Sequence, residues 1–142
     1  MEPRPSRGAR PAVLAASAVE IFGRDRVVEW CEELLAGSVG ADARDRPDIG
    51  WLGGTAGWPE YWARVWGARG LLHIGPPVRP QVVLSALADP QWRVREMALK
   101  VIARHEIDDP AGAVDAATRD AVKRVRDAAW RALDVPGPDP RR

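Results

Sequence analysis

The sequence predicts an all-α fold, organised as a short right-handed α-solenoid of about three helical hairpins that follows an N-terminal helical pair. The main observation is an internal repeat: "VVLSALADPQWRVREMALKVI" (82–102) aligns with "AVDAATRDAVKRVRDAAWRAL" (113–133) at a constant offset of 31 residues and without a gap. Acidic, basic and apolar positions keep their class along the alignment. A repeat of this length is typical of stacked helical units, each of which buries its apolar face on the next.

The N-terminal helical pair is expected over residues 11–37. Pro11 suits the start of a helix over residues 11–22, because its missing N–H group is not needed there and its φ angle already fits a helix. In "DRVVEWCEELLAG", Asp25 is suited to cap the second helix and Gly37 to end it. The apolar residues between them recur at helical spacing and are Val27, Val28, Cys31, Leu34 and Leu35.

The connection over residues 38–57 is rich in Gly and Asp and has neither helical nor strand periodicity. Connections of this length without secondary structure are uncommon in compact domains. Trp51 and Leu52 indicate that the connection is attached to the body of the protein, either as a lid over a binding surface or as a structural cover. The two ends of the chain, residues 1–10 and 136–142, are rich in Pro, Gly and Arg and are expected to be disordered.

Residues 58–135 are expected to contain the repeated units. In the middle unit, Pro80 opens a short first helix, and Asp89 is the expected N-cap of a second helix that starts at Pro90. The second helix has one apolar stripe at helical spacing in each of the last two units. The stripes are Val94, Met97, Ala98, Val101 and Ile102 in the middle unit, and Val125, Ala128, Ala129, Ala132 and Leu133 in the last.

The segment "GWPEYWARVWGARGLL" (57–72) is a third and weaker copy of the second helix. Arg64 aligns with Arg93 at an offset of 29 residues, whereas Leu71 aligns with Val101 at an offset of 30 residues. This alignment predicts a slip of one residue within the helix.

The repeated pattern has an Asp at the turn, then Val-Arg, then Ala and Leu-type residues at fixed steps. It resembles the short bacterial HEAT-like repeat, which also occurs in phycobilin-lyase-type proteins and in small HEAT-domain proteins. The resemblance covers residues 58–135 and is strongest in the last two units. It implies HEAT-like hairpins and a binding function, although a fold does not fix a function. It also implies a ladder of bonds between neighbouring repeats, made by Asp89, Asp120, Arg95 and Arg126.

Composition and charge limit the classes of partner. The 21 basic and 20 acidic residues leave a net charge of +1, so no overall field attracts nucleic acid. Cys31 is the only cysteine, which excludes an internal disulfide and fits a reducing, cytoplasmic location. No run approaches the roughly 18 apolar residues of a membrane span, so we expect no membrane partner.

The sequence contains no catalytic pattern that we can identify. His73 and His105 do not form the His-Glu-x-x-His zinc pattern, and no Gly-x-Ser-x-Gly nucleophile turn is present. We therefore assign no catalytic residue, no metal site and no cofactor, and the sequence favours a non-enzymatic protein.

A helical wheel divides the tryptophans into two groups. At about 100° per residue, Trp58 and Trp62 fall on or beside the buried stripe and are expected in the core. A second group lies off that stripe, where aromatic rings and arginines on consecutive helices could bind a peptide or a nucleic-acid backbone. The alternative is that the N-terminal helices or the connection cover this group. The candidate ligand-binding residues are Trp66, Trp92, Arg93, Arg95, Leu99, Lys123, Arg126 and Trp130.

Three functions remain open at this point. The first is a non-enzymatic HEAT-repeat adaptor that engages a protein or peptide on the face of its second helices. The second is a DNA-binding protein that resembles the HEAT-like alkylpurine DNA glycosylases, although a chain of about three units with little net charge fits a duplex less well. The third is a phycobilin-lyase-type helper. Self-association through the C-terminal repeat is a further expectation, because Trp130 would lie at the open end of the array.

Overall fold

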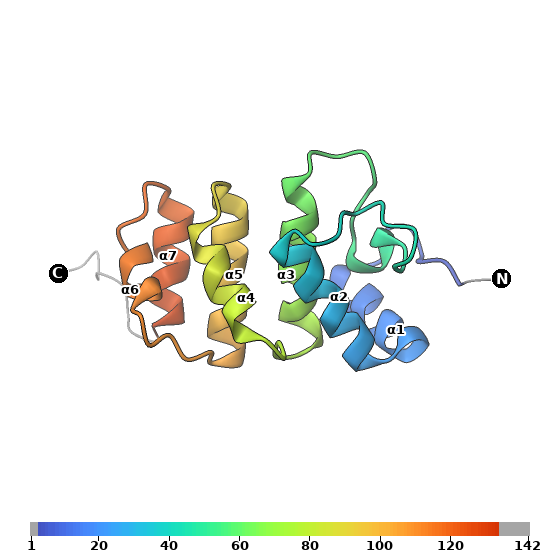
Figure 1. The fold of residues 1–142 in the computed structure, drawn as a ribbon, viewed down its shortest axis with the longest axis horizontal. Coiled ribbons are helices and arrows are strands. Elements are labelled where there is room, and N and C mark those ends of the chain that lie inside the picture. Colours follow the sequence, from blue (N-terminus) through green and yellow to red (C-terminus); the bar gives the residue numbers. More distant parts are fainter. Residues whose placement is uncertain (1–2, 134–142) are drawn as a thin grey trace.

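The computed structural model describes residues 3–133, and within that range it contains helices and loops but no β-strand (Figure 1). The all-α prediction is therefore confirmed for these residues. Residues 1–2 and 134–142, which include the predicted tail over 136–142, lie outside the described range. The seven α-helices are α1 (Pro11–Phe22), α2 (Arg24–Ala36), α3 (Tyr61–Ile74), α4 (Pro80–Ser85), α5 (Trp92–His105), α6 (Ala113–Ala117) and α7 (Lys123–Ala132). Two 3-10 helices are η1 (Ile49–Leu52) and η2 (Ala86–Ala88).

The helices form two rows (Figure 1). The longer helices α3, α5 and α7 make one row, in which α3 packs on α5 and α5 packs on α7. The short helices α4 and α6 lie against α5 and α7, and α2 packs against α3. Helix α1 packs on α2, α3 and η1 and closes the N-terminal end of the molecule.

The helices α3 and α5 run in the same direction. Near their N-terminal ends, Arg64 of α3 bonds to Asp89, which lies just before α5. Near their C-terminal ends, Nε2 of His105 in α5 lies 2.8 Å from the carbonyl oxygen of Leu71 in α3. Contacts at both ends require parallel helices, so their first turns lie along the same edge of the molecule.

Asp89 and Asp120 shape the turns that precede α5 and α7. The Asp89 carboxylate accepts a hydrogen bond from the backbone N–H of Gln91 at 2.8 Å, and Asp120 accepts one from Val122 at 2.9 Å. Side chains of this type commonly bond to the backbone two residues further along and so close a tight turn. The helix α5 therefore begins two residues later than the expected start at Pro90, and Gln91 takes the N-cap position that was predicted for Asp89.

The buried residues extend the offset of 31 residues from α5 back to α3. Every buried residue of α5 has a buried counterpart in α3 at this offset. The apolar pairs are Ala63 with Val94, Gly67 with Ala98, Ala68 with Leu99, Gly70 with Val101, and Leu71 with Ile102. The predicted slip of one residue within α3 is therefore wrong, because a single offset aligns the whole helix.

The close contact between α2 and α3 depends on two glycines of α3. A Cβ atom at Gly67 would lie 2.7 Å from the carbonyl oxygen of Cys31, and a Cβ atom at Gly70 would overlap the Cys31 Sγ atom. Cys31 is fully buried at this contact, and burial, together with the neighbouring Glu32, raises the pKa of its thiol. Cys31 is thus a packing residue, as its place on the apolar face of α2 predicts.

The ends of α2 are close to the expected ones. The helix begins at Arg24, after Gly23, so Asp25 lies in its first turn instead of at its cap. A carboxylate in the first turn is favourable beside the free N–H groups of the helix. Gly37 follows the last residue with a φ of 79°, the left-handed conformation that glycine adopts without strain.

The connection over residues 38–57 folds back onto the helices. Trp51 and Leu52 belong to η1 and are buried, and the Trp51 ring meets the Phe22 ring edge to face with 6.0 Å between centroids. Arg69 of α3 donates a hydrogen bond to the carbonyl oxygen of Leu52 at 3.0 Å. The predicted attachment through Trp51 and Leu52 is confirmed.

Candidate binding surface

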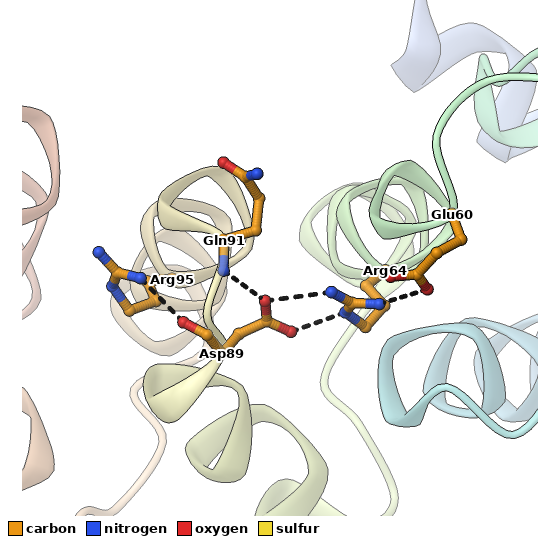
Figure 2. A network of polar contacts seen from close by, with 5 residues as sticks. All are labelled: Glu60, Arg64, Asp89, Gln91 and Arg95. Atoms are coloured by element: carbon orange, nitrogen blue, oxygen red, sulfur yellow. Dashed lines mark hydrogen bonds and ion pairs between the residues drawn. The ribbon is translucent and has the colours of Figure 1, made fainter.

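Two arginine–aspartate contacts of the same geometry join the helices of the longer row. Arg64 of α3 donates from Nε to Asp89 at 2.7 Å (Figure 2), and Arg95 of α5 donates from Nε to Asp120 at 2.8 Å. Each step has a second bond: Arg95 donates to the carbonyl oxygen of Asp89, and Arg126 donates to that of Asp120, both at 2.8 Å. The ladder expected for Asp89, Asp120, Arg95 and Arg126 is therefore present, and Arg64 extends it to α3.

Arg95 uses every nitrogen of its guanidinium group in this ladder. Nε and Nη2 bond to the carboxylate of Asp120, and Nη1 bonds to the carbonyl oxygen of Asp89. Burial of Asp120 opposes its ionisation, but the bonds from Arg95 and from the Val122 N–H outweigh this effect, so the pKa of Asp120 lies below its ordinary value. We assign Arg95 to the packing of α7 on α5 instead of to ligand binding.

Two of the predicted surface residues lie in the core. Trp66 is 3% exposed and Leu99 is 0% exposed, so their placement on a binding surface is wrong. The wheel assumed one buried stripe per helix, whereas α5 packs on α3 at one side and on α7 at the other. Trp66 is also covered by the connection, since a Cβ atom at Gly54 would lie 2.5 Å from the Trp66 ring.

The tryptophans that were expected in the core are the exposed ones. Trp58 is 53% exposed and Trp62 is partly exposed. The wheel took Arg64 as the equivalent of Arg93, whereas the burial pattern makes Arg64 the equivalent of Arg95. An error of two residues turns every wheel position by about 200°, which exchanges the buried and the exposed sides of a helix.

The exposed rings belong to a continuous surface, which we name the tryptophan–arginine strip and define as Trp58, Trp62, Arg93, Trp92 and Arg124. The rings of Trp58 and Trp62 meet with 5.3 Å between centroids. The Arg93 Cζ atom lies 5.5 Å from the Trp62 centroid and 4.5 Å from the Trp92 centroid. Arg124 Cζ lies 5.4 Å from the Trp92 centroid, so rings and guanidinium groups alternate from α3 to α7.

The strip follows directly from the repeat. Trp62, Arg93 and Arg124 are the second residues of α3, α5 and α7, and they follow one another at an offset of 31 residues. Since the first turns of these helices lie along one edge, these side chains lie along it too. The same offset, extended upstream of residue 82, is the signal that could have identified Trp62 and Arg124 from the sequence. The first residues of the same helices are Tyr61, Trp92 and Lys123.

A pocket of about 350 Å³ opens beside Trp58, between the end of α2 and the start of α3. Trp58, Trp66 and Leu34 contribute apolar walls, and Arg64 and Asp42 contribute polar groups. Arg64 is already neutralised by its contacts with the ladder. The pocket therefore extends the strip by a concave, partly apolar region.

Arg93 is the cation of the strip without a counter-ion. Between residues 3 and 133, no carboxylate oxygen lies within 4.0 Å of its guanidinium nitrogens, and it donates no hydrogen bond. Arg124, by contrast, donates to Glu96 at 2.9 Å, and the adjacent Lys123 donates to Asp127 at 2.8 Å. The N–H groups of Arg93 therefore remain free to bind a partner.

The remaining predicted residues lie around the strip or away from it. Lys123 is exposed and borders the strip, whereas Arg126 takes part in the ladder. Trp130 is half-buried, two turns further along α7. Of the eight candidates, the structure brings Trp92, Arg93 and Lys123 together on one exposed surface.

Comparisons with protein-family models, with curated proteins and with solved structures found no match for this chain. Within the part of the chain that the structure describes, no group of three or more His, Cys, Asp or Glu side chains is placed to hold a metal ion. In the same part, no helix is long and apolar enough to cross a membrane. The strip and its pocket are therefore the features on which a function can be argued.

Proposed function

We propose that this protein is a non-enzymatic binding module that engages a segment of a partner protein on the tryptophan–arginine strip. The observation that carries the proposal is the strip itself, in which tryptophans and arginines from three helices share one surface. Tryptophan and arginine are enriched among the residues that dominate binding energy at protein interfaces. Trp58, at 53% exposed, is also a large apolar side chain that a partner would bury.

The same proposal includes the architecture, a short right-handed α-solenoid of HEAT-like hairpins. Its support is the repetition of one contact: Arg64 bonds Asp89, and Arg95 bonds Asp120 one unit further along. Two successive hairpins, α4 with α5 and α6 with α7, follow these bonds. Repeat proteins of this kind use extended surfaces made by equivalent positions of successive units, and the strip is such a surface.

A protein segment fits the strip better than a nucleic acid does. Proteins that bind single strands need free ring faces on which bases stack. Here Trp62 has Tyr61 stacked on it and Arg93 over its ring, and Trp92 has both Arg93 and Arg124 over its ring. The net charge of +1 also gives little attraction for a polyanion. We find no corresponding support for a phycobilin-lyase-type helper.

Site-specific photo-crosslinking in a lysate of the source organism tests this function. A photo-reactive amino acid replaces Lys123, which borders the strip, and a matched variant carries it at Arg104, which is exposed at the other end of the α5 helix. We expect discrete protein adducts from position 123 and none from position 104. Adding Trp92→Ala to the first variant should remove the adducts while circular dichroism still shows the folded protein. Adducts with nucleic acid, or the same adducts from both positions, would contradict the proposal.

A further inference from the structure

We infer that the strip recognises an acidic segment of the partner protein, with Arg93 and Arg124 as the residues that bind its carboxylates. The inference rests on the proposed function, because it specifies the chemistry of the partner at that same surface. Three observations carry it: the fixed position of Arg93, its missing counter-ion, and the short distance between the two guanidinium groups.

Arg93 is held in position before a partner binds. Its guanidinium carbon lies 4.5 Å from the Trp92 centroid and 5.5 Å from the Trp62 centroid, so two rings fix one side chain. Guanidinium N–H groups point outward in the plane of the group, and stacking on rings leaves them free to donate. A side chain that is already ordered loses less entropy on binding, which favours affinity.

The counter-ion of Arg93 is missing where neighbouring arginines have theirs. On the same edge of the molecule, Arg64, Arg95 and Arg124 each bond to a carboxylate. Between residues 3 and 133, Arg93 bonds to none. A planar guanidinium matches a carboxylate through two parallel N–H···O bonds, so a carboxylate from a partner would complete the pattern.

Arg124 provides the second binding group. Its guanidinium carbon lies 5.4 Å from the Trp92 centroid, so it is less than twice that distance from that of Arg93. Its Nε atom bonds to Glu96, which leaves both terminal nitrogens available, and its side chain is 66% exposed. Side chains two residues apart in an extended segment are about 6.6 Å apart. An extended segment with acidic residues at alternate positions therefore fits both arginines.

Carboxylates fit this surface better than phosphate groups. A phosphate carries nearly two charges and three acceptor oxygens and requires several cationic donors. The strip has one arginine without a counter-ion and a second that Glu96 already neutralises in part. Single carboxylates spread over neighbouring residues match this modest and distributed charge.

Fluorine NMR of the full chain labelled with 5-fluorotryptophan tests the inference. The probe is a blocked eight-residue peptide of alternating Glu and Ala, and the matched peptide has Gln in place of Glu. We expect the Glu peptide to shift the resonances of Trp62 and Trp92 and the Gln peptide to leave them unchanged. Arg93→Gln should weaken the Glu peptide at least about tenfold. Arg93→Lys, which keeps the charge but loses the planar fork, should restore only part of the affinity.

The control is Arg104→Gln, an exposed arginine at the opposite end of α5, which should leave the affinity unchanged. Equal binding of the Gln peptide, or an equal loss of affinity in Arg104→Gln, would overturn the inference. Shifts by inorganic phosphate or by oligothymidylate at lower concentrations than the Glu peptide would overturn it too. If the Glu peptide fails while protein adducts from position 123 persist, the acidic partner is wrong but the binding function stands; loss of both ends both proposals.

Discussion

Arg95 of α5 donates to both carboxylate oxygens of Asp120, at 2.8 and 3.1 Å. Arg64 of α3 makes the same pair of bonds to Asp89, at 2.7 and 3.3 Å. Two-point contacts between an arginine and a carboxylate fix orientation as well as distance. The ladder thus sets how each long helix lies against the next, and the rings and guanidinium groups of the strip align because of it.

Asp120→Asn should destabilise the protein by about 2 kcal/mol, because it leaves the Arg95 guanidinium without its partner in a largely buried place. The two side chains are only 17% and 12% exposed. The control is Asp115→Asn, which removes an exposed pair with Arg119 and should cost less than about 0.5 kcal/mol. Urea unfolding measures both free energies, and equal losses would show that the ladder contributes nothing beyond a surface ion pair.

The effect of Asp120→Asn should also depend on pH. The pKa of Asp120 is lowered in the folded protein, because the bonds from Arg95 and Val122 outweigh its burial. Its contribution is therefore fully present above the unfolded pKa of about 3.9 and is lost as the pH falls through the folded pKa. The difference in unfolding free energy between wild type and variant should be constant above about pH 5 and shrink below about pH 4. A difference that grows on acidification would contradict this assignment.

The tryptophans should differ sharply in their contributions to stability. Trp66→Ala removes a ring that is 3% exposed and should cost about 3–5 kcal/mol. Trp58→Ala removes a ring that is 53% exposed and should cost less than about 1.5 kcal/mol. Chemical denaturation of the two variants gives the comparison. The reverse order would return Trp58 to the core and Trp66 to the surface.

Gly70→Ala should destabilise the protein by about 1–3 kcal/mol, because its new methyl group overlaps the Cys31 Sγ atom. Cys31→Ala alone should also cost stability, because it leaves a cavity at the same contact. In the double variant, the methyl group partly fills that cavity, so the total loss should be smaller than the sum of the single losses. Additive losses, measured by urea unfolding, would place the two residues apart.

Self-association through α7 remains a prediction. Trp130 of α7 is half-buried, whereas Leu99 at the equivalent position of α5 is fully buried between its neighbours. A second copy of the chain against α7 would bury Trp130 in the same way. Sedimentation velocity should then show a dimer for the wild type that dissociates in Trp130→Ala. A monomer in both cases would exclude this contact.

The repeat over residues 82–133 was sufficient to predict the last two hairpins. The helices α5 and α7 are copies of one unit, so cap, apolar stripe and charged positions agree in the two copies and support one another. Both stripes are buried as expected at Val94 and Val125. The resemblance to HEAT-like repeats added the ladder, because a bond between units cannot be derived from the spacing within one unit.

The register of α3 could not be predicted from the same pattern. A local Arg-Val match at an offset of 29 residues is better than the match at 31, where Gly67 and Gly70 stand in place of Ala98 and Val101. These glycines are explained by the close contact with Cys31 of α2, a tertiary contact that a single sequence does not show. The wrong register then reversed the exposed and buried tryptophans and concealed the strip.

The most direct test of the account is an NMR measurement of Arg93 in the free protein. If its guanidinium group lies between the rings of Trp62 and Trp92, its δ-methylene protons should be shifted upfield by ring currents and should show nuclear Overhauser contacts to both indoles. Shifts typical of a solvated arginine, with contacts to neither ring, would contradict the strip and the functions proposed for it.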